Sequence, residues 1–146
     1  MPLDPSFVGR SWPAVTYEVG REKIREFAVA VGATDPVHTD VEAARAAGHP
    51  DVVAPPTFPV VFTWAATREV VDDPALGLDF TRVVHRDQGF ELHRPVVAGD
   101  VLTSVVSVAE VKELAGNDVV TFRCDVTDPH GASVLVSTAT LVGRAS

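Results

Sequence analysis

The chain has 146 residues, of which 46% are hydrophobic and 22% charged, and its formal net charge at pH 7 is −8. This length and apolar content predict one globular domain, residues 1–146, with a full hydrophobic core. The negative charge repels phosphate backbones and no local basic patch is visible in the sequence, so nucleic acid is not an expected partner.

Cysteine and histidine usage excludes several further classes of protein. The single cysteine, Cys124, rules out an internal disulfide and a cluster of thiolate ligands. No two histidines have a metal-binding spacing, so we expect neither a metal nor another cofactor. The N-terminus lacks the regions of a signal peptide, and no apolar run reaches membrane-spanning length. We therefore expect a cytoplasmic protein that does not cross a membrane.

The first predicted element is an amphipathic helix that begins after Gly20. Its apolar side chains recur at i, i+3, i+4 and i+7, with charged residues on the other face: Ile24, Phe27, Ala28 and Val31. Gly32 predicts a left-handed residue that ends this helix, and Pro36 then prevents helical continuation. The loop that leads to His38 is therefore expected to be rigid. A second short helix, 41–47, is predicted from its cap Asp40 to a stop at Gly48.

A third helix, almost wholly apolar, is predicted over residues 57–71, after Pro55-Pro56 and before Asp72-Asp73-Pro74. A helix that is apolar nearly all round has to be buried nearly all round. Its N-terminus offers free N–H groups and the positive end of the helix dipole to an oxyanion. Because proline has no N–H, the first donors would be Thr57 and Phe58. The alternative is that the two prolines only end the preceding segment.

The remainder of the sequence predicts strands. Four segments are rich in Val, Thr and Phe with period-two stretches, and short turns containing Gly, Asn, Asp or Pro separate them: 80–97, 101–114, 119–127 and 133–142. A buried helix followed by a long antiparallel meander predicts an α+β protein in which the sheet curls around the helix. The pattern alone leaves other α+β folds open.

The loop Gly32-Ala33-Thr34-Asp35-Pro36-Val37-His38 resembles the catalytic loop of the MaoC-like, hydratase-2 type, hot-dog dehydratases. That family carries Gly-Asp, any residue, Asn-Pro, an aliphatic residue and His at this place. The segments 85–91 and 94–100 resemble its sheet segment and its Arg-Pro…Ala-Gly-Asp turn. The run 18–27 resembles N-terminal-type MaoC domains, which include accessory subunits of heterodimeric (3R)-hydroxyacyl-ACP dehydratases of fatty acid elongation. The resemblance implies a single hot-dog fold, an antiparallel sheet wrapped around a central helix.

The family chemistry assigns roles to two residues of this loop. Dehydration of a 3-hydroxyacyl thioester removes a proton from C2 and donates one to the C3 hydroxyl, while negative charge develops on the thioester oxygen. The resemblance makes His38 one proton-handling group. Asp35 is either the accompanying carboxylate or a turn-forming Asp before Pro36. Ala33 stands where the family has Asp and cannot ionise.

Two more residues are candidates for substrate binding. Gln88 belongs to a polar cluster with His85 and Asp87 in a predicted strand, one face of which would line an acyl channel; the blander alternative is a solvated strand face. Arg94 offers a guanidinium to a phosphopantetheine phosphate, or else forms a structural salt bridge in its turn.

Three functions are compatible with these residues. The first is a (3R)-specific enoyl-thioester hydratase or 3-hydroxyacyl-thioester dehydratase, a hydro-lyase that acts on acyl-CoA or acyl-ACP. The second is a non-catalytic acyl-binding subunit of a heterodimeric dehydratase whose partner carries the intact Asp/His motif. The third, a thioesterase, would need a carboxylate on the central helix, where only Glu69 is present near the far end. Because an isolated hot-dog layer leaves an open sheet edge, we expect a homodimer, or a heterodimer with another MaoC-like chain.

Overall fold

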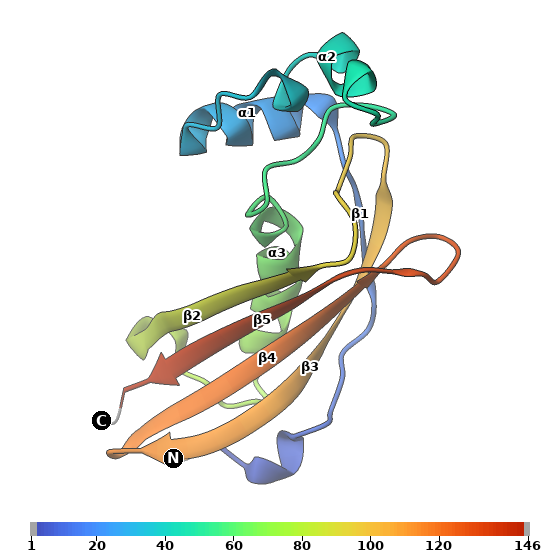
Figure 1. The fold of residues 1–146 in the computed structure, drawn as a ribbon. Coiled ribbons are helices and arrows are strands. Elements are labelled where there is room, and N and C mark those ends of the chain that lie inside the picture. Colours follow the sequence, from blue (N-terminus) through green and yellow to red (C-terminus); the bar gives the residue numbers. More distant parts are fainter. Residues whose placement is uncertain (1–2, 145–146) are drawn as a thin grey trace.

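The computed structural model describes residues 3–144, which form one antiparallel sheet with a helix across one face and two shorter helices at one end (Figure 1). The helices are α1 (Arg21–Val31), α2 (Val41–Ala46) and α3 (Val60–Val71). The strands are β1 (Val15–Glu18), β2 (Val83–Leu92), β3 (Val101–Leu114), β4 (Asn117–Thr127) and β5 (Ser133–Gly143). Three single-turn 3-10 helices are η1 (Pro5–Phe7), η2 (Pro36–His38) and η3 (Phe80–Arg82).

The sheet has the strand order β1-β3-β4-β5-β2. All of its neighbouring strands are antiparallel. The α+β hot-dog fold expected from the sequence is confirmed, because α3 packs against one face of this antiparallel sheet (Figure 1). Among residues 3–144, strand β2 pairs with β5 alone, so its other side is an open edge. Within residues 3–144, no helix is long and apolar enough to cross a membrane.

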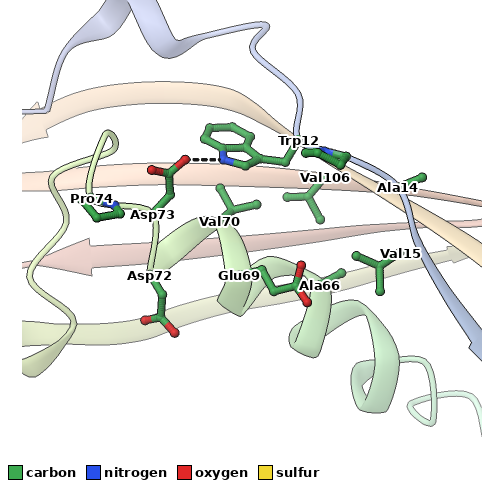
Figure 2. A pocket seen from close by; sticks show the side chains of 11 residues that line it. Trp12, Ala14, Val15, Ala66, Glu69, Val70, Asp72, Asp73, Pro74 and Val106 are labelled. Atoms are coloured by element: carbon green, nitrogen blue, oxygen red, sulfur yellow. Dashed lines mark hydrogen bonds between the residues drawn. The ribbon is translucent and has the colours of Figure 1, made fainter.

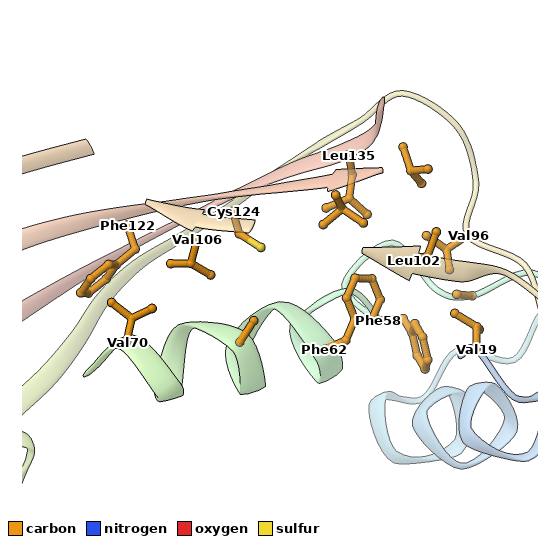
Figure 3. Close-up of a cluster of buried hydrophobic side chains, with 14 of the residues drawn as sticks. Val19, Phe58, Phe62, Val70, Val96, Leu102, Val106, Phe122, Cys124 and Leu135 are labelled. Carbon is orange, nitrogen blue, oxygen red and sulfur yellow. The ribbon is translucent and has the colours of Figure 1, made fainter. Parts of the chain in front are cut away.

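The core lies between α3 and the sheet (Figure 3). Phe58 and Phe62 contact each other beneath the strands, and Phe58 also meets Phe27 of α1 edge to face. The sheet supplies alternate side chains to this core, as a period-two pattern requires: Leu102, Val106, Phe122, Cys124 and Leu135. The helix α1 contributes Ile24 and Ala28, which are fully buried. The apolar face predicted for α1 is therefore correct apart from Val31, which is 52% exposed.

Two expectations about the central helix need correction. It begins at Val60 rather than residue 57, because residues 55–59 form turns in which the Phe58 N–H donates to the Pro55 carbonyl. Its burial is also less complete than a wholly apolar sequence implies. Ala65 is exposed and Trp64 half-buried, since the sheet covers only one side of the helix.

Strand limits differ from the sequence prediction where the chain turns. Residues 80–82 form a 3-10 turn capped by Asp79, and residues after Leu92 leave the sheet, so β2 is shorter than the predicted 80–97 segment. Strand β1 was not predicted, because four residues give too little alternation to register as a pattern. By contrast, β3 has the predicted bounds.

Candidate active site

The loop that carries His38 is built by local capping interactions. Gly32 ends α1 with φ of 72°, in the left-handed region that favours glycine. After it, the Asp35 carboxylate accepts a hydrogen bond from the Val37 N–H at 3.0 Å and caps the 3-10 turn that contains His38. Pro36 is the first residue of that turn, where its missing N–H costs nothing. The loop is therefore held at both ends, as the sequence predicted.

The Nδ1 edge of the His38 ring is fixed by the backbone of the segment that contains Val53. The Nδ1 of His38 lies 2.6 Å from the Val53 carbonyl oxygen, and in return the Val53 N–H donates to the Val37 carbonyl at 2.9 Å. A carbonyl only accepts, so Nδ1 carries the hydrogen and Nε2 keeps a lone pair when the ring is neutral. The imidazole is half-buried. Its geometry is that of a base held in one tautomer.

His38 lines a pocket of about 420 Å³ at the end of the sheet near α1 and α2. Most of the wall is apolar or proline, drawn from the segment before α3 and the segment after β2: Val53, Ala54, Pro55, Pro56, Pro59, Leu92, Pro95 and Val96. His93 and Arg94 are the other ionisable residues of the wall. Among the described residues, no carboxylate lines this pocket.

Asp35 has the contacts of a turn-forming residue. Its side chain is exposed, caps the turn before His38 and is not part of the pocket wall. Ala33 is half-buried directly after α1, with its N–H donated to the Ala28 carbonyl at 2.8 Å. Neither of the two positions that differ from the family loop therefore places a carboxylate in the pocket beside His38.

The two residues expected as oxyanion donors, Thr57 and Phe58, differ in whether their backbone N–H is already hydrogen-bonded. The Phe58 N–H is not free, because it donates to the Pro55 carbonyl at 2.9 Å, and the Phe58 ring is fully buried in the core. This corrects the expectation of a free donor at Phe58. Thr57 is exposed, and its N–H makes no backbone hydrogen bond within the part of the chain that the structure describes.

Gln88 and Arg94 both have protein partners. The Gln88 side-chain amide donates to the Ser137 hydroxyl at 2.8 Å, across to β5. Arg94 makes a two-pronged salt bridge to Asp100, with N–O distances of 2.9 and 3.0 Å, and this carboxylate also accepts from the Val97 N–H. The pairing raises the pKa of the Arg94 guanidinium. Arg94 therefore fixes the turn between β2 and β3 that forms one wall of the pocket.

His93 is a pocket residue to which the sequence gave no role. Its Nδ1 lies 2.8 Å from the Ser133 hydroxyl and its Nε2 lies 3.2 Å from the Glu91 carboxylate. The signal that could have indicated it is its position beside Arg94-Pro95, where the chain leaves the sheet. Cys124, by contrast, is no candidate nucleophile, because burial raises its thiol pKa to about 11.

Glu69 lies in a different pocket, at the other end of α3 (Figure 2). That pocket has a volume of about 350 Å³, and Trp12, Asp72 and Asp73 are also in its wall. The Trp12 indole N–H donates to the Asp73 carboxylate at 2.7 Å. His38 is not among its lining residues. The carboxylate of the central helix and the histidine of the loop therefore do not form one site.

Residues 6–136 match the family described as FAS1-like, dehydratase domain region. The chain belongs to this family of MaoC-like hot-dog dehydratases. It is 58% identical to a UPF0336 protein of Streptomyces griseus, across 100% of this chain and 98% of that one. A UPF0336 protein of Saccharopolyspora erythraea is 54% identical over 99% of this chain and 93% of its own length. The family membership expected from the loop at residues 32–38 is confirmed.

Solved structures of MaoC-like dehydratases also match this chain in fold. A chain of the C-terminally truncated HadBC (3R-hydroxyacyl-ACP dehydratase) complex of Mycobacterium tuberculosis is 33% identical with a TM-score of 0.85, over 94% of this chain and 97% of that one. A structure described as a MaoC-like dehydratase is 36% identical with a TM-score of 0.88. The match covers 97% of this chain but 43% of that longer one.

Proposed function

We propose that this chain is a subunit of a (3R)-specific dehydratase of 3-hydroxyacyl thioesters, paired with a second MaoC-like chain that carries the intact Asp/His loop. The observation that carries the proposal is the wall of the His38 pocket, which is largely apolar and lacks a carboxylate among the described residues. Such a wall suits an acyl chain and offers few groups for a two-proton exchange.

The chemistry needs one group to take the C2 proton and another to protonate the leaving hydroxyl. Among the described residues, the pocket of this chain has a candidate for one of these groups only, the Nε2 of His38, which the contact with Val53 leaves available. Ala33 cannot ionise, and the Asp35 carboxylate caps its own turn. Thr57 is not a lining residue of the pocket but lies next to Pro56, which is, so its N–H remains the candidate donor to a thioester oxygen. A partner with the full loop would supply both proton-handling groups in its own pocket.

A second candidate function is favoured by the fixed tautomer of His38. A neutral imidazole held by a carbonyl has the geometry of a general base, so the chain would hydrate enoyl thioesters by itself. That reaction would require a second group, either Asp35 after leaving its cap or a bound water.

The open edge of β2 favours pairing with another hot-dog chain, because an unpaired strand of this length is a ready template for association. The HadBC complex, which a similar chain helps to form, is described as a 3R-hydroxyacyl-ACP dehydratase. We therefore propose an acyl-CoA or acyl-ACP substrate, a homodimer or a heterodimer with a MaoC-like chain, and a place in cytoplasmic fatty acid metabolism.

The decisive experiment assays this chain alone and together with a MaoC-like chain that has the intact loop, on crotonyl-CoA and on a longer enoyl thioester. We expect hydration only from the pair. His38→Gln in this chain should then lower kcat far less than loss of the partner's loop Asp, which should cost about 100- to 10,000-fold. Full turnover by this chain alone, abolished by His38→Gln, would establish the second candidate instead.

A further inference from the structure

We propose that a pocket at the opposite end of the sheet binds the phosphate of a thioester carrier. The pocket has a volume of about 630 Å³ and lies where β2 begins, β5 ends and β4 begins. Figure 1 shows these three strand ends together, away from α1 and α2. Its lining residues are Val84, His85, Arg86, Asn117, Val142 and Arg144. His85, Arg86 and Arg144 are basic, and no acidic residue within residues 3–144 lines this pocket.

The two arginines are available to an anion. Arg86 Nε lies 3.2 Å from the neighbouring Asp87 carboxylate, but the two side chains are 52% and 67% exposed, so this pair contributes little and can give way to a stronger partner. Arg144 is placed by its N–H, which donates to the Arg82 carbonyl at 3.0 Å. Its exposed guanidinium makes no ion pair with any described residue.

The remaining polar groups of the pocket are fixed in place. The His85 ring stacks on Trp64 at 5.0 Å, and its Nε2 lies 3.1 Å from the Asp87 carbonyl. Asn117 begins β4 at the tip of the hairpin after β3. Its side-chain amide donates to the carbonyls of Leu114 and Ala115, each at 3.4 Å.

The charge of this pocket contrasts with the charge of the whole chain. The sequence has 20 acidic and 12 basic residues, so most of its surface repels anions. A concave site walled by two arginines and one histidine attracts them locally. The guanidinium fork matches the geometry of phosphate oxygens, which makes a phosphate ester the fitting ligand.

The position of the pocket indicates that the bound phosphate would belong to the thioester in the partner's His38-type pocket. This step rests on the proposed function. Residues 84–86 of β2 line this pocket and Leu92 of β2 lines the His38 pocket, so about 20 to 27 Å of strand separates the two pockets of one chain. If two chains pair along their open β2 edges in antiparallel fashion, the start of one β2 lies beside the end of the other. Arg86 and Arg144 would then hold the phosphate of a carrier whose acyl group occupies the partner's pocket.

The test is calorimetric titration of the full chain with adenosine 3′,5′-bisphosphate, coenzyme A and 4′-phosphopantetheine. We expect saturable binding that weakens as salt rises. Arg86→Gln and Arg144→Gln should each raise Kd about tenfold, the usual effect of losing a charge-assisted hydrogen bond. Arg123→Gln is the matched control, because Arg123 is equally exposed on the same sheet, also pairs with a carboxylate, and lies outside the pocket.

The outcomes separate the sources and the two proposals. Tight binding of the adenosine bisphosphate indicates a coenzyme A phosphate, whereas binding of 4′-phosphopantetheine alone indicates a carrier protein. Absence of saturable binding by the wild-type chain, or equal affinities for the wild type and the Arg86→Gln/Arg144→Gln variant, overturns the phosphate site. An enoyl N-acetylcysteamine thioester, which has no phosphate, tests the dehydratase separately. Its turnover by the pair would support the proposed function even if the phosphate site fails.

Discussion

Substitutions at Asp35 distinguish most sharply between a structural and a catalytic role for its carboxylate. Its carboxylate is exposed and accepts the Val37 N–H at 3.0 Å, so Asp35→Ala removes one cap from a three-residue turn. Loss of such a cap costs about 1 kcal/mol, which corresponds to a fall in Tm of about 3 °C for a chain of this length. Asp35→Asn keeps the accepting oxygen and removes only the charge, so its Tm should stay within about 1 °C of the wild type.

The assay combines thermal unfolding by circular dichroism with turnover in the active form of the enzyme. If Asp35 only caps the turn, Asp35→Asn should retain the wild-type kcat. A general acid or base would behave differently, because its loss lowers kcat by about 100-fold or more while leaving Tm unchanged. That second result would refute the structural interpretation and return Asp35 to the mechanism.

Three more predictions follow from the loop, the N-terminal segment and the sheet edge. Ala33→Asp restores the family carboxylate within the loop at residues 32–38 and should raise the hydratase activity of the chain alone. Its cost in Tm should be small, because residue 33 is not fully buried. An unchanged or slower rate in an already active chain would contradict this prediction. The Trp12 hydrogen bond lowers the pKa of Asp73 below 3.8, so its stabilisation is present above that pH and is lost as pH falls through the lowered pKa. The difference in urea unfolding free energy between wild type and Trp12→Phe should therefore be constant from about pH 7 to 5 and shrink below pH 3.8, and a difference that stays constant to pH 2 would exclude the linkage. The isolated chain should sediment as a homodimer at micromolar concentration, and a mass near 15.5 kDa would count against pairing through the β2 edge.

The elements that the sequence predicted well are those governed by neighbouring residues. Helix α1 runs between Gly20 and Gly32 because amphipathic spacing and glycine caps act within a few residues. Strand β3 has its predicted bounds because an alternating pattern is enclosed by two turn sequences. The start of α3 was misplaced, since three prolines in residues 55–59 allow either a helical first turn or the separate turns observed.

The sequence by itself determined the family, the fold class and the place of His38, because the loop at residues 32–38 is continuous and its capping is local. Only the tertiary structure decided what surrounds that histidine. The carbonyl of Val53 and the wall after β2 come from distant segments, and local patterns carry no information on which of them meet. For the same reason, the sequence alone does not indicate the basic pocket. Arg86 and Arg144 lie far apart in an acidic sequence and become neighbours only because β2 pairs with β5.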